Sequence, residues 1–166
     1  MRPHVDGLEA RGIAAGAIDL PLRKAEAAVP VYRQRTEGLS DPPGGLIISG
    51  QSYGGRVASL LAAEDEAACA GLICFSYPLH RPGRRDWQVR SAHWPSITVP
   101  VLLLSGESDP FAKIDLLRLA IAERLPHAQL VTYPKTGHSL KSVLDDVLDR
   151  AAVFVRECEA IIQTRS

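Results

Sequence analysis

The sequence of 166 residues has few of the residues that build disulfide frameworks and metal sites. It contains three cysteines, Cys69, Cys74 and Cys158, and no C-x-x-C pair. An odd number of cysteines without that spacing argues against a disulfide framework and a zinc site, and the five histidines show no metal-ligand spacing. We therefore expect three buried thiols in a reducing compartment, with no metal and no cofactor.

Net charge is also missing, because nineteen basic residues balance nineteen acidic ones. Without an excess of positive charge, nothing predicts binding to nucleic acid or to an anionic membrane. The apolar runs are as long as strands and far shorter than the roughly 20 residues of a membrane span. Residues 1–6 contain no apolar core of a signal peptide. These absences favour a cytoplasmic protein whose partner is a small molecule.

What the sequence does contain is a regular alternation of short apolar runs with longer amphipathic segments. The apolar runs predict five strands at residues 12–21, 46–49, 71–75, 99–104 and 129–133. Strands that are apolar on both faces are typical of a sheet covered on both sides. The sequence therefore predicts one α/β domain over residues 1–166, with a mostly parallel sheet and helices on both faces.

The segments between these runs predict helices. Apolar residues recur three or four positions apart in residues 55–63 and 114–125, and in a longer stripe from Leu140 to Ile161. Ser142, with Asp145 three residues later, fits a capping box at the start of that last helix. We interpret the apolar stripes as core-facing surfaces.

A candidate nucleophile lies between the second predicted strand and the helix after it. Ser52 is the central residue of a G-x-S-x-G motif, Gly50-Gln51-Ser52-Tyr53-Gly54. The motif places a serine on a sharp turn, so we expect the residues two before and two after it to need almost no side chain. The turn would aim the N–H of Tyr53 at a developing oxyanion. Alone, the motif also fits a glycine-rich or phosphate-binding turn, although no Gly-Lys-Ser/Thr follows as in a P-loop.

A candidate acid and base follow two later strands. Asp109 lies in a turn after the most apolar run, where an aspartate alone is often a turn former, and Glu107 is a weaker rival. His138 follows the last predicted strand. The order Ser52, Asp109, His138, with each residue after its own strand, is typical of one large class of serine hydrolases. We predict that Ser52 attacks, that His138 takes its proton, and that Asp109 orients the imidazole.

With these motifs in place, the sequence resembles the α/β-hydrolase superfamily, in particular the small dienelactone-hydrolase-like branch that includes relatives of testis-expressed protein 30. The matching stretches are residues 12–21, 50–56, 71–80, 105–111 and 137–139. The resemblance implies that Ser52, Asp109 and His138 correspond to the family triad. Dienelactone hydrolases use a cysteine where this chain has Ser52, so their substrate is not carried over.

The sequence departs from this family at its start. The resemblance implies a strand that comes earlier in the sequence and ends in a His-Gly motif. In the sheet this strand would lie between the strands at 12–21 and 46–49, and the loop after it would supply a second oxyanion donor. The chain begins beyond that motif. We therefore expect an N-terminally truncated fold with one oxyanion donor, the Tyr53 N–H. We also expect weak turnover, self-association into a homo-oligomer or low stability, and a natural start upstream of Met1.

The connection at residues 79–98 is too short for a separate lid domain. It contains several cationic and aromatic side chains: His80, Arg81, Arg84, Arg85, Trp87, Arg90, His93 and Trp94. These residues fit either a wall that faces the site and binds an anion or aromatic group, or a solvated surface turn with two partly buried tryptophans. Composition favours the second interpretation.

Together these features predict a lidless carboxylic-ester hydrolase that acts on small acyl substrates. Its alternative is a non-catalytic binding or scaffold protein with the same fold, because a fold alone does not give a function. The triad favours the enzyme, whereas the absent second donor favours the alternative. Other acyl or peptide chemistry remains a third hypothesis.

Overall fold

A parallel sheet of four strands forms the centre of the computed structural model, which describes residues 2–37, 39 and 45–164. Its strands are β1 (Ile47–Gln51), β2 (Gly71–Phe75), β3 (Val101–Gly106) and β4 (Gln129–Tyr133). They lie in the order β1-β2-β3-β4, and each neighbouring pair is parallel. The predicted fold class is confirmed, and four of the five predicted strands are present.

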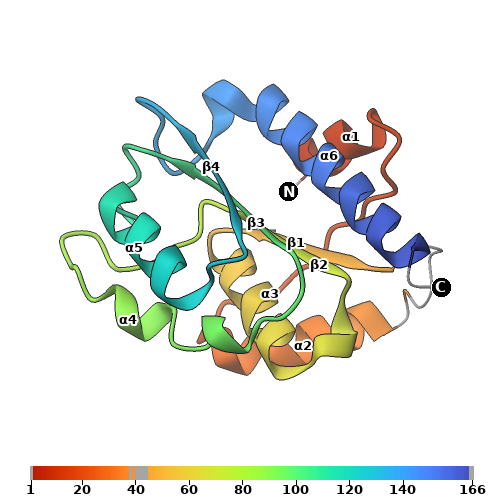
Figure 1. Cartoon of the computed structure of the whole chain (residues 1–166), viewed down its shortest axis with the longest axis horizontal. Helices are drawn as coiled ribbons and strands as arrows, with labels where there is room; N and C mark the ends of the chain where they lie inside the picture. The colour runs from red at the N-terminus through yellow and green to blue at the C-terminus, as the bar shows by residue number, and fades with distance from the viewer. Residues whose placement is uncertain (1, 38, 40–44, 165–166) are drawn as a thin grey trace.

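Two layers of helices cover the sheet, as Figure 1 shows. One layer contains α1 (Arg2–Glu9) and α6 (Leu144–Gln163). The other contains α2 (Ala25–Glu37), α3 (Tyr53–Glu64) and α5 (Ile114–Arg124), with the single-turn helix α4 (Trp87–Arg90) beside them. Three short 3-10 helices complete the described elements: η1 (Glu66–Ala68), η2 (Trp94–Ser96) and η3 (Lys141–Val143).

The two central strands explain why the sequence is apolar on both faces of the sheet. Every residue of β2 and β3 is buried. Successive side chains of a strand point to opposite faces. Thus Phe75 and Leu104 pack with α6, whereas Cys74 and Leu103 belong to the cluster formed with α2, α3 and α5. All three cysteines are free and buried, as predicted.

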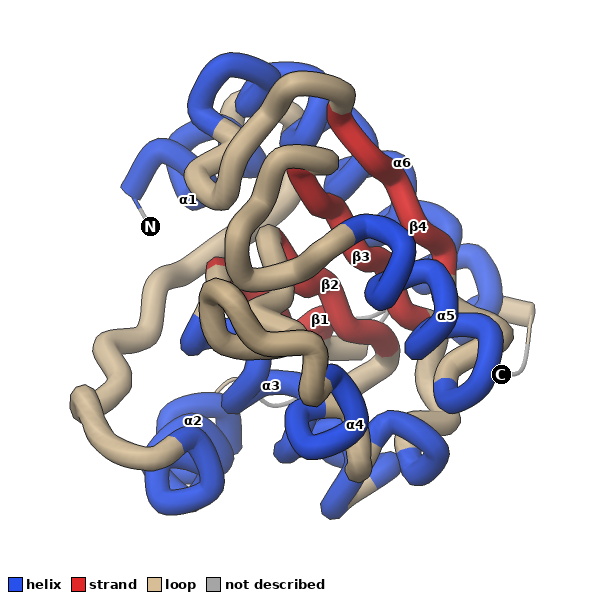
Figure 2. Tube along the Cα trace, turned by 90° about the vertical axis from the view of Figure 1, so that its left-hand side faces the viewer, coloured by secondary structure: helices blue, strands red, loops and turns tan. Residues whose placement is uncertain are grey.

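The first predicted strand, at residues 12–21, is wrong. Residues 13–21 form neither helix nor strand, and the chain crosses here from one helical layer to the other on the β1 side of the sheet (Figure 2). A glycine- and alanine-rich segment has little side chain to pack, and strand propensity depends on such packing. The open edge of β1 is instead bonded by Tyr32, whose hydroxyl donates to the Ser49 carbonyl (2.9 Å) and accepts from the Ser49 N–H (3.2 Å).

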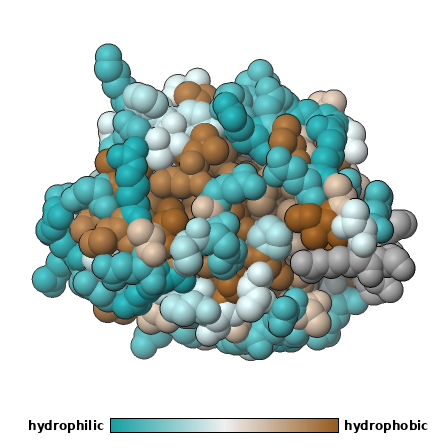
Figure 3. Space-filling view, in the orientation of Figure 1, coloured by the Kyte–Doolittle hydropathy of each residue, from teal (hydrophilic) through white to brown (hydrophobic). Residues whose placement is uncertain are grey.

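Two helix boundaries also differ from the prediction. The capping box at Ser142 is wrong, because Ser142 lies within η3 and α6 begins at Leu144 without a side-chain cap. Helix α2 had no prediction, and it contains Pro30, a residue that normally interrupts a helix. Among the described residues, no helix is long and apolar enough to cross a membrane. Apolar residues gather between the two helical layers, with polar residues above and below them (Figure 3).

Candidate active site

Ser52 lies on a strained turn between β1 and α3. Its φ of 51° and ψ of −114° are unfavourable for a residue with a side chain. The Ser52 N–H donates to the Phe75 carbonyl of β2 (2.8 Å), which fixes the turn against the sheet. A Cβ at Gly50 would lie 2.2 Å from the carbonyl carbon of Gly54 and 2.3 Å from the nitrogen of Gly55. The chain therefore approaches itself so closely at Gly50 that only glycine fits there.

The expectation for Gly54 is wrong. A Cβ at Gly54 would meet nothing within 4 Å, whereas a Cβ at Gly55 would lie 2.7 Å from the Gly50 carbonyl oxygen. The close approach thus joins Gly50 and Gly55. The second position without space for a side chain is three residues after Ser52 and not two.

The three predicted site residues lie together in a hydrogen-bonded chain. His138 Nε2 is 2.8 Å from Ser52 Oγ, and His138 Nδ1 is 2.7 Å from Asp109 Oδ2. The Asp109 side chain has no exposed surface, whereas that of His138 is 25% exposed. A carboxylate can only accept, so Nδ1–H donates to Asp109 and Nε2 accepts the Ser52 hydroxyl proton. This is the arrangement that a general base needs.

The loops that carry the acid and the base are attached to each other. The Ser108 N–H donates to the Thr136 carbonyl (2.9 Å). At the end of β3, a Cβ at Gly106 would lie 2.2 Å from the Thr136 oxygen and 2.5 Å from the Gly137 oxygen. The absence of a side chain at Gly106 therefore lets the His138 loop lie directly against the end of β3.

The rival acid, Glu107, lies in a different environment. Its Oε1 accepts from the Thr132 hydroxyl (2.8 Å) and is 3.8 Å from the Arg118 guanidinium. The remaining oxygen of Asp109, Oδ1, accepts the Phe111 N–H (2.8 Å), so both oxygens of that carboxylate have partners. The geometry therefore favours Asp109 as the acid.

His80, the first of the cationic and aromatic residues noted in the connection at 79–98, contacts the segment that follows Asp109. Its ring is 1% exposed, accepts the Lys113 N–H at Nε2 (2.9 Å) and donates from Nδ1 to the Arg81 carbonyl (2.9 Å). The His80 N–H donates to the Phe111 carbonyl (2.9 Å). The Phe111 ring in turn packs on the His138 ring at 4.6 Å. No sequence spacing predicts this contact, because it joins segments 33 residues apart.

Tyr53 is the first residue of α3, and its N–H lies next to Ser52. Among the described residues, no group accepts a hydrogen bond from this N–H. The start of a helix carries a partial positive charge, so the free N–H is suited to a developing oxyanion. The Tyr53 hydroxyl donates to the Pro21 carbonyl (2.9 Å), which holds the segment before α2 close to this turn.

A cleft of about 890 Å³ opens beside Ser52. Its lining includes five cationic side chains and only two carboxylates, Glu26 and Asp86; the cations are Arg23, Lys24, Arg56, Arg81 and Arg90. Residues 81–86 are exposed, as expected of a solvated turn, but the prediction that the two tryptophans are only partly buried is wrong. Trp87 and Trp94 are buried in the core, whereas Arg81 and Arg90 face the cleft, because the aromatic rings have the apolar surface to bury.

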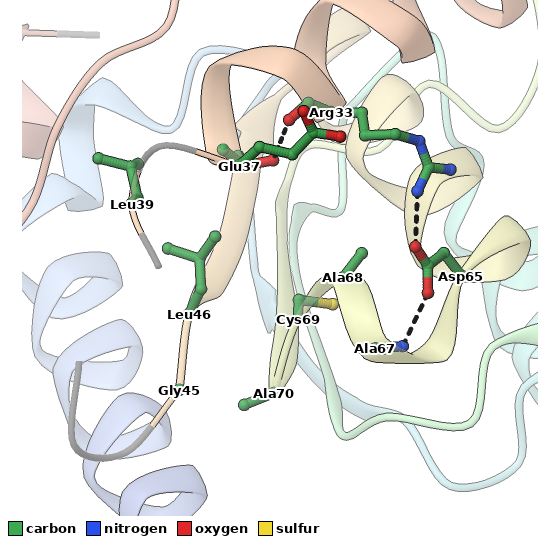
Figure 4. Close-up of a pocket in the computed structure, with 11 residues that line it drawn as sticks. Arg33, Glu37, Leu39, Gly45, Leu46, Asp65, Ala67, Ala68, Cys69 and Ala70 are labelled. Carbon is green, nitrogen blue, oxygen red and sulfur yellow. Dashed lines mark hydrogen bonds and ion pairs between the residues drawn. The ribbon is translucent and has the colours of Figure 1, made fainter. Parts of the chain in front are cut away.

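A second cavity, of about 470 Å³, lies at the opposite ends of β1 and β2 (Figure 4). Its cation, Arg33, pairs with Asp65 (2.6 Å) and Glu64 (3.3 Å). Burial raises the pKa of the Cys69 thiol in its wall to about 12, so this sulfur stays protonated and unreactive. Within residues 2–37, 39 and 45–164, no group of three or more His, Cys, Asp or Glu side chains could hold a metal ion. The cleft at Ser52 is therefore the candidate active site.

Comparisons with known proteins bear on the fold and the family of the chain. A family model described as an alpha/beta hydrolase domain matches residues 20–165. An esterase of Pyrococcus furiosus superposes with a TM-score of 0.78 at 16% identity, covering 95% of this chain and 74% of the esterase. A monoacylglycerol lipase of Paleococcus ferrophilus gives 0.76 at 13% identity, covering 95% and 88%.

A third solved structure, E-2-(acetamidomethylene)succinate hydrolase, gives a TM-score of 0.69 at 14% identity, covering 83% of this chain and 76% of that one. At such low identities, the solved structures show a shared fold. The dienelactone-hydrolase-like branch suggested by the sequence is not distinguished by these matches. The family match, which spans most of the sequence, establishes that the chain belongs to the α/β-hydrolase domain family.

Proposed function

We propose that this chain is a serine hydrolase that cleaves carboxylic esters of small acyl groups. The observation that supports it is the chain of short hydrogen bonds from Asp109 through His138 to Ser52 on its strained turn. A serine hydroxyl is a poor nucleophile until a base removes its proton, and His138 Nε2 is positioned to do so.

The reaction proceeds in two steps that restore the protein. Ser52 Oγ bonds to the ester carbonyl carbon while its proton moves to His138 Nε2, and Asp109 stabilises the imidazolium that forms. The proton then passes to the departing alkoxide, which leaves as an alcohol as its bond to the acyl carbon breaks. Water attacks the acyl-enzyme with His138 again as base, and the products are a carboxylic acid and free Ser52.

The developing negative charge lies beside the first turn of α3 in this mechanism. The Tyr53 N–H is the oxyanion donor, and removing one such donor from a hydrolase typically lowers the rate by about 10²–10³-fold. The three buried free thiols support a reducing, cytoplasmic location as part of the same proposal.

The test is labelling by a fluorophosphonate, which reacts with an activated serine. We expect the wild type to be labelled at one serine and to hydrolyse short-chain nitrophenyl esters, and Ser52→Ala to lose both properties. Ser105→Ala is the matched control, since Ser105 is buried at the end of β3 and its hydroxyl has no partner among the described residues. An unlabelled wild type that remains folded would favour the non-catalytic binding protein.

A further inference from the structure

The cleft beside Ser52 is strongly cationic in a chain whose net charge is zero. Its five cations and two carboxylates leave a formal excess of three positive charges. The first residues of two helices, Ala25 of α2 and Tyr53 of α3, also line it. Each helix start adds a partial positive charge in the same place. A local excess of this kind, without an overall positive charge, indicates a binding site for an anion.

Arg56 is the best-placed of these cations. It lies in the first turn of α3, directly after the turn that carries Ser52, and it lines the same cleft as Ser52. Its side chain is 15% exposed, and Nη2 pairs with Glu26 Oε1 at 2.6 Å. Its Nη1 is buried and has no hydrogen-bond partner among the described residues. A buried guanidinium nitrogen without a partner is unfavourable, so a further acceptor at this position would stabilise it.

Arg90 adds a second cation whose charge no carboxylate neutralises directly. Its Nη1 donates to the carbonyls of Pro78 (2.9 Å) and His80 (3.4 Å), which fixes the guanidinium at the cleft. Burial lowers the pKa of Arg90, and the nearby Arg56 guanidinium lowers it further. Two like charges held close together gain from an anion that lies between them.

We propose that the cleft binds a carboxylate at the far end of the acyl group of the substrate, with Arg56 as its principal partner. This inference rests on the proposed ester hydrolysis for the position of the scissile bond. Arg56 already donates a hydrogen bond to one carboxylate, that of Glu26, which supports a carboxylate as the ligand. Arg56 follows Tyr53 on α3, the side of the oxyanion donor, whereas His138, which protonates the leaving group, reaches Ser52 Oγ from the loop after β4, so we place the acyl side towards the cations.

The test compares three nitrophenyl esters of equal chain length: the hexanoate, the half-ester of adipic acid, and the same adipate with its free carboxyl methylated. We expect kcat/KM for the free carboxylate to exceed that of its methyl ester by about 10-fold or more at low salt. Added salt should reduce this preference. Arg56→Gln should lower the ratio towards one.

Glu26→Gln should change the ratio in the opposite direction, because it frees Nη2 of Arg56. A folding defect would slow all three esters alike and leave the ratio unchanged, so the opposite shifts distinguish charge recognition from damage. Arg33→Gln, in the other cavity, is the control cation and should leave the ratio as in the wild type.

Binding of monomethyl adipate to the Ser52→Ala protein, measured by calorimetry, separates the two proposals. Hydrolysis without preference for the carboxylate, or a preference that Arg56→Gln leaves intact, overturns the anion site and keeps the hydrolase. If the wild type hydrolyses no ester, but monomethyl adipate binds to Ser52→Ala and the added change Arg56→Gln weakens that binding, the anion site is kept and the hydrolase is overturned. If the protein shows neither hydrolysis nor binding, both proposals are overturned.

Discussion

Both cavities described above contain arginine, but the arginines at the two ends of the sheet differ in how far nearby carboxylates neutralise their charge. At the amino ends of β1 and β2, Arg33 contacts two carboxylates within 3.3 Å. At the carboxyl ends, beside Ser52, five cations share two carboxylates, and Arg56 keeps a buried nitrogen without a partner among the described residues. Charge that is balanced inside the chain serves structure, whereas charge left unbalanced in a cleft is available to a ligand.

Parallel strands explain why the end of the sheet with the unbalanced charge is also the end where Ser52, Asp109 and His138 meet. Ser52 and Asp109 follow β1 and β3, and His138 follows β4, so all three loops meet at one edge. Open α/β sheets bind their ligands in the crevice outside the carboxyl ends of the strands, so side chains placed there can face an opening. The amino-end cavity lacks such a convergence, and its cation, Arg33, is paired with Asp65.

The largest expected effect comes from breaking the triad itself. His138→Ala should lower kcat at least about 10³-fold, and Asp109→Asn should lose nearly as much because the imidazole then adopts the wrong tautomer. Glu107→Gln should lose far less, since Glu107 contacts Thr132 and Arg118. Rates on a short-chain nitrophenyl ester, with circular dichroism as the check on folding, measure this. An inactive Glu107→Gln beside an active Asp109→Asn would reverse the assignment of the acid.

A smaller loss should follow from moving the base without removing it. Gly106→Ala forces the Thr136 and Gly137 carbonyls away from the end of β3, which displaces the loop of His138. A misplacement of about 1 Å can cost roughly 10²-fold in rate. Gly137→Ala is the matched control, because a Cβ there would meet nothing within 4 Å. Equal rates for the two variants would show that the loop adapts and that the close approach is not required.

The sequence brought Ser52, Asp109 and His138 together as candidates because each follows an apolar run that could be recognised locally, and the structure places them in hydrogen-bond contact. The strands at 71–75 and 129–133 were predicted with the bounds that the structure has. What could not be predicted depends on contacts between distant segments. Whether residues 12–21 form a strand depends on whether the fold gives them a strand to pair with. The contact of His80 with Lys113 forms only once β2 and β3 lie side by side. Likewise, the cations at 79–98 suggested an anion-binding wall as one alternative, but the sequence does not show that Arg23, Lys24 and Arg56 join Arg81 and Arg90 in one cleft.

A buried histidine next to α3, His93, should affect the pH dependence of stability. Burial, with a further contribution from Arg56, lowers the pKa of His93 from 6.5 to about 4, and its Nε2 lies 2.8 Å from Ser59 Oγ. A histidine with a lowered pKa in the folded state stabilises the fold above pH 6.5, and this contribution is lost as pH falls towards 4. We expect a loss of about 1–3 kcal/mol over that range, which His93→Gln should reduce.

Denaturant unfolding at a series of pH values measures this contribution. The wild type and His93→Gln should differ by a constant amount above pH 7 and converge as pH falls, because glutamine has no proton to gain. His4, whose pKa burial also lowers, remains in both proteins and sets the common background. Parallel curves for the two proteins would show that His93 does not carry the effect.

The smallest expected effect belongs to the balanced end of the molecule. Arg33→Ala removes an ion pair whose side chains are between 32% and 55% exposed, and such pairs contribute about 0–1 kcal/mol. The melting temperature should therefore fall only slightly, and ester hydrolysis and the preference for a carboxylate should not change. A large effect of Arg33→Ala on that preference would mean that the anion responds to the charge of the whole chain, and not to Arg56 and its neighbours. The difference between the two cavities is thus measured most directly by the preference for a carboxylate, which should hardly change when Arg33 is replaced and should fall strongly when Arg56 is replaced.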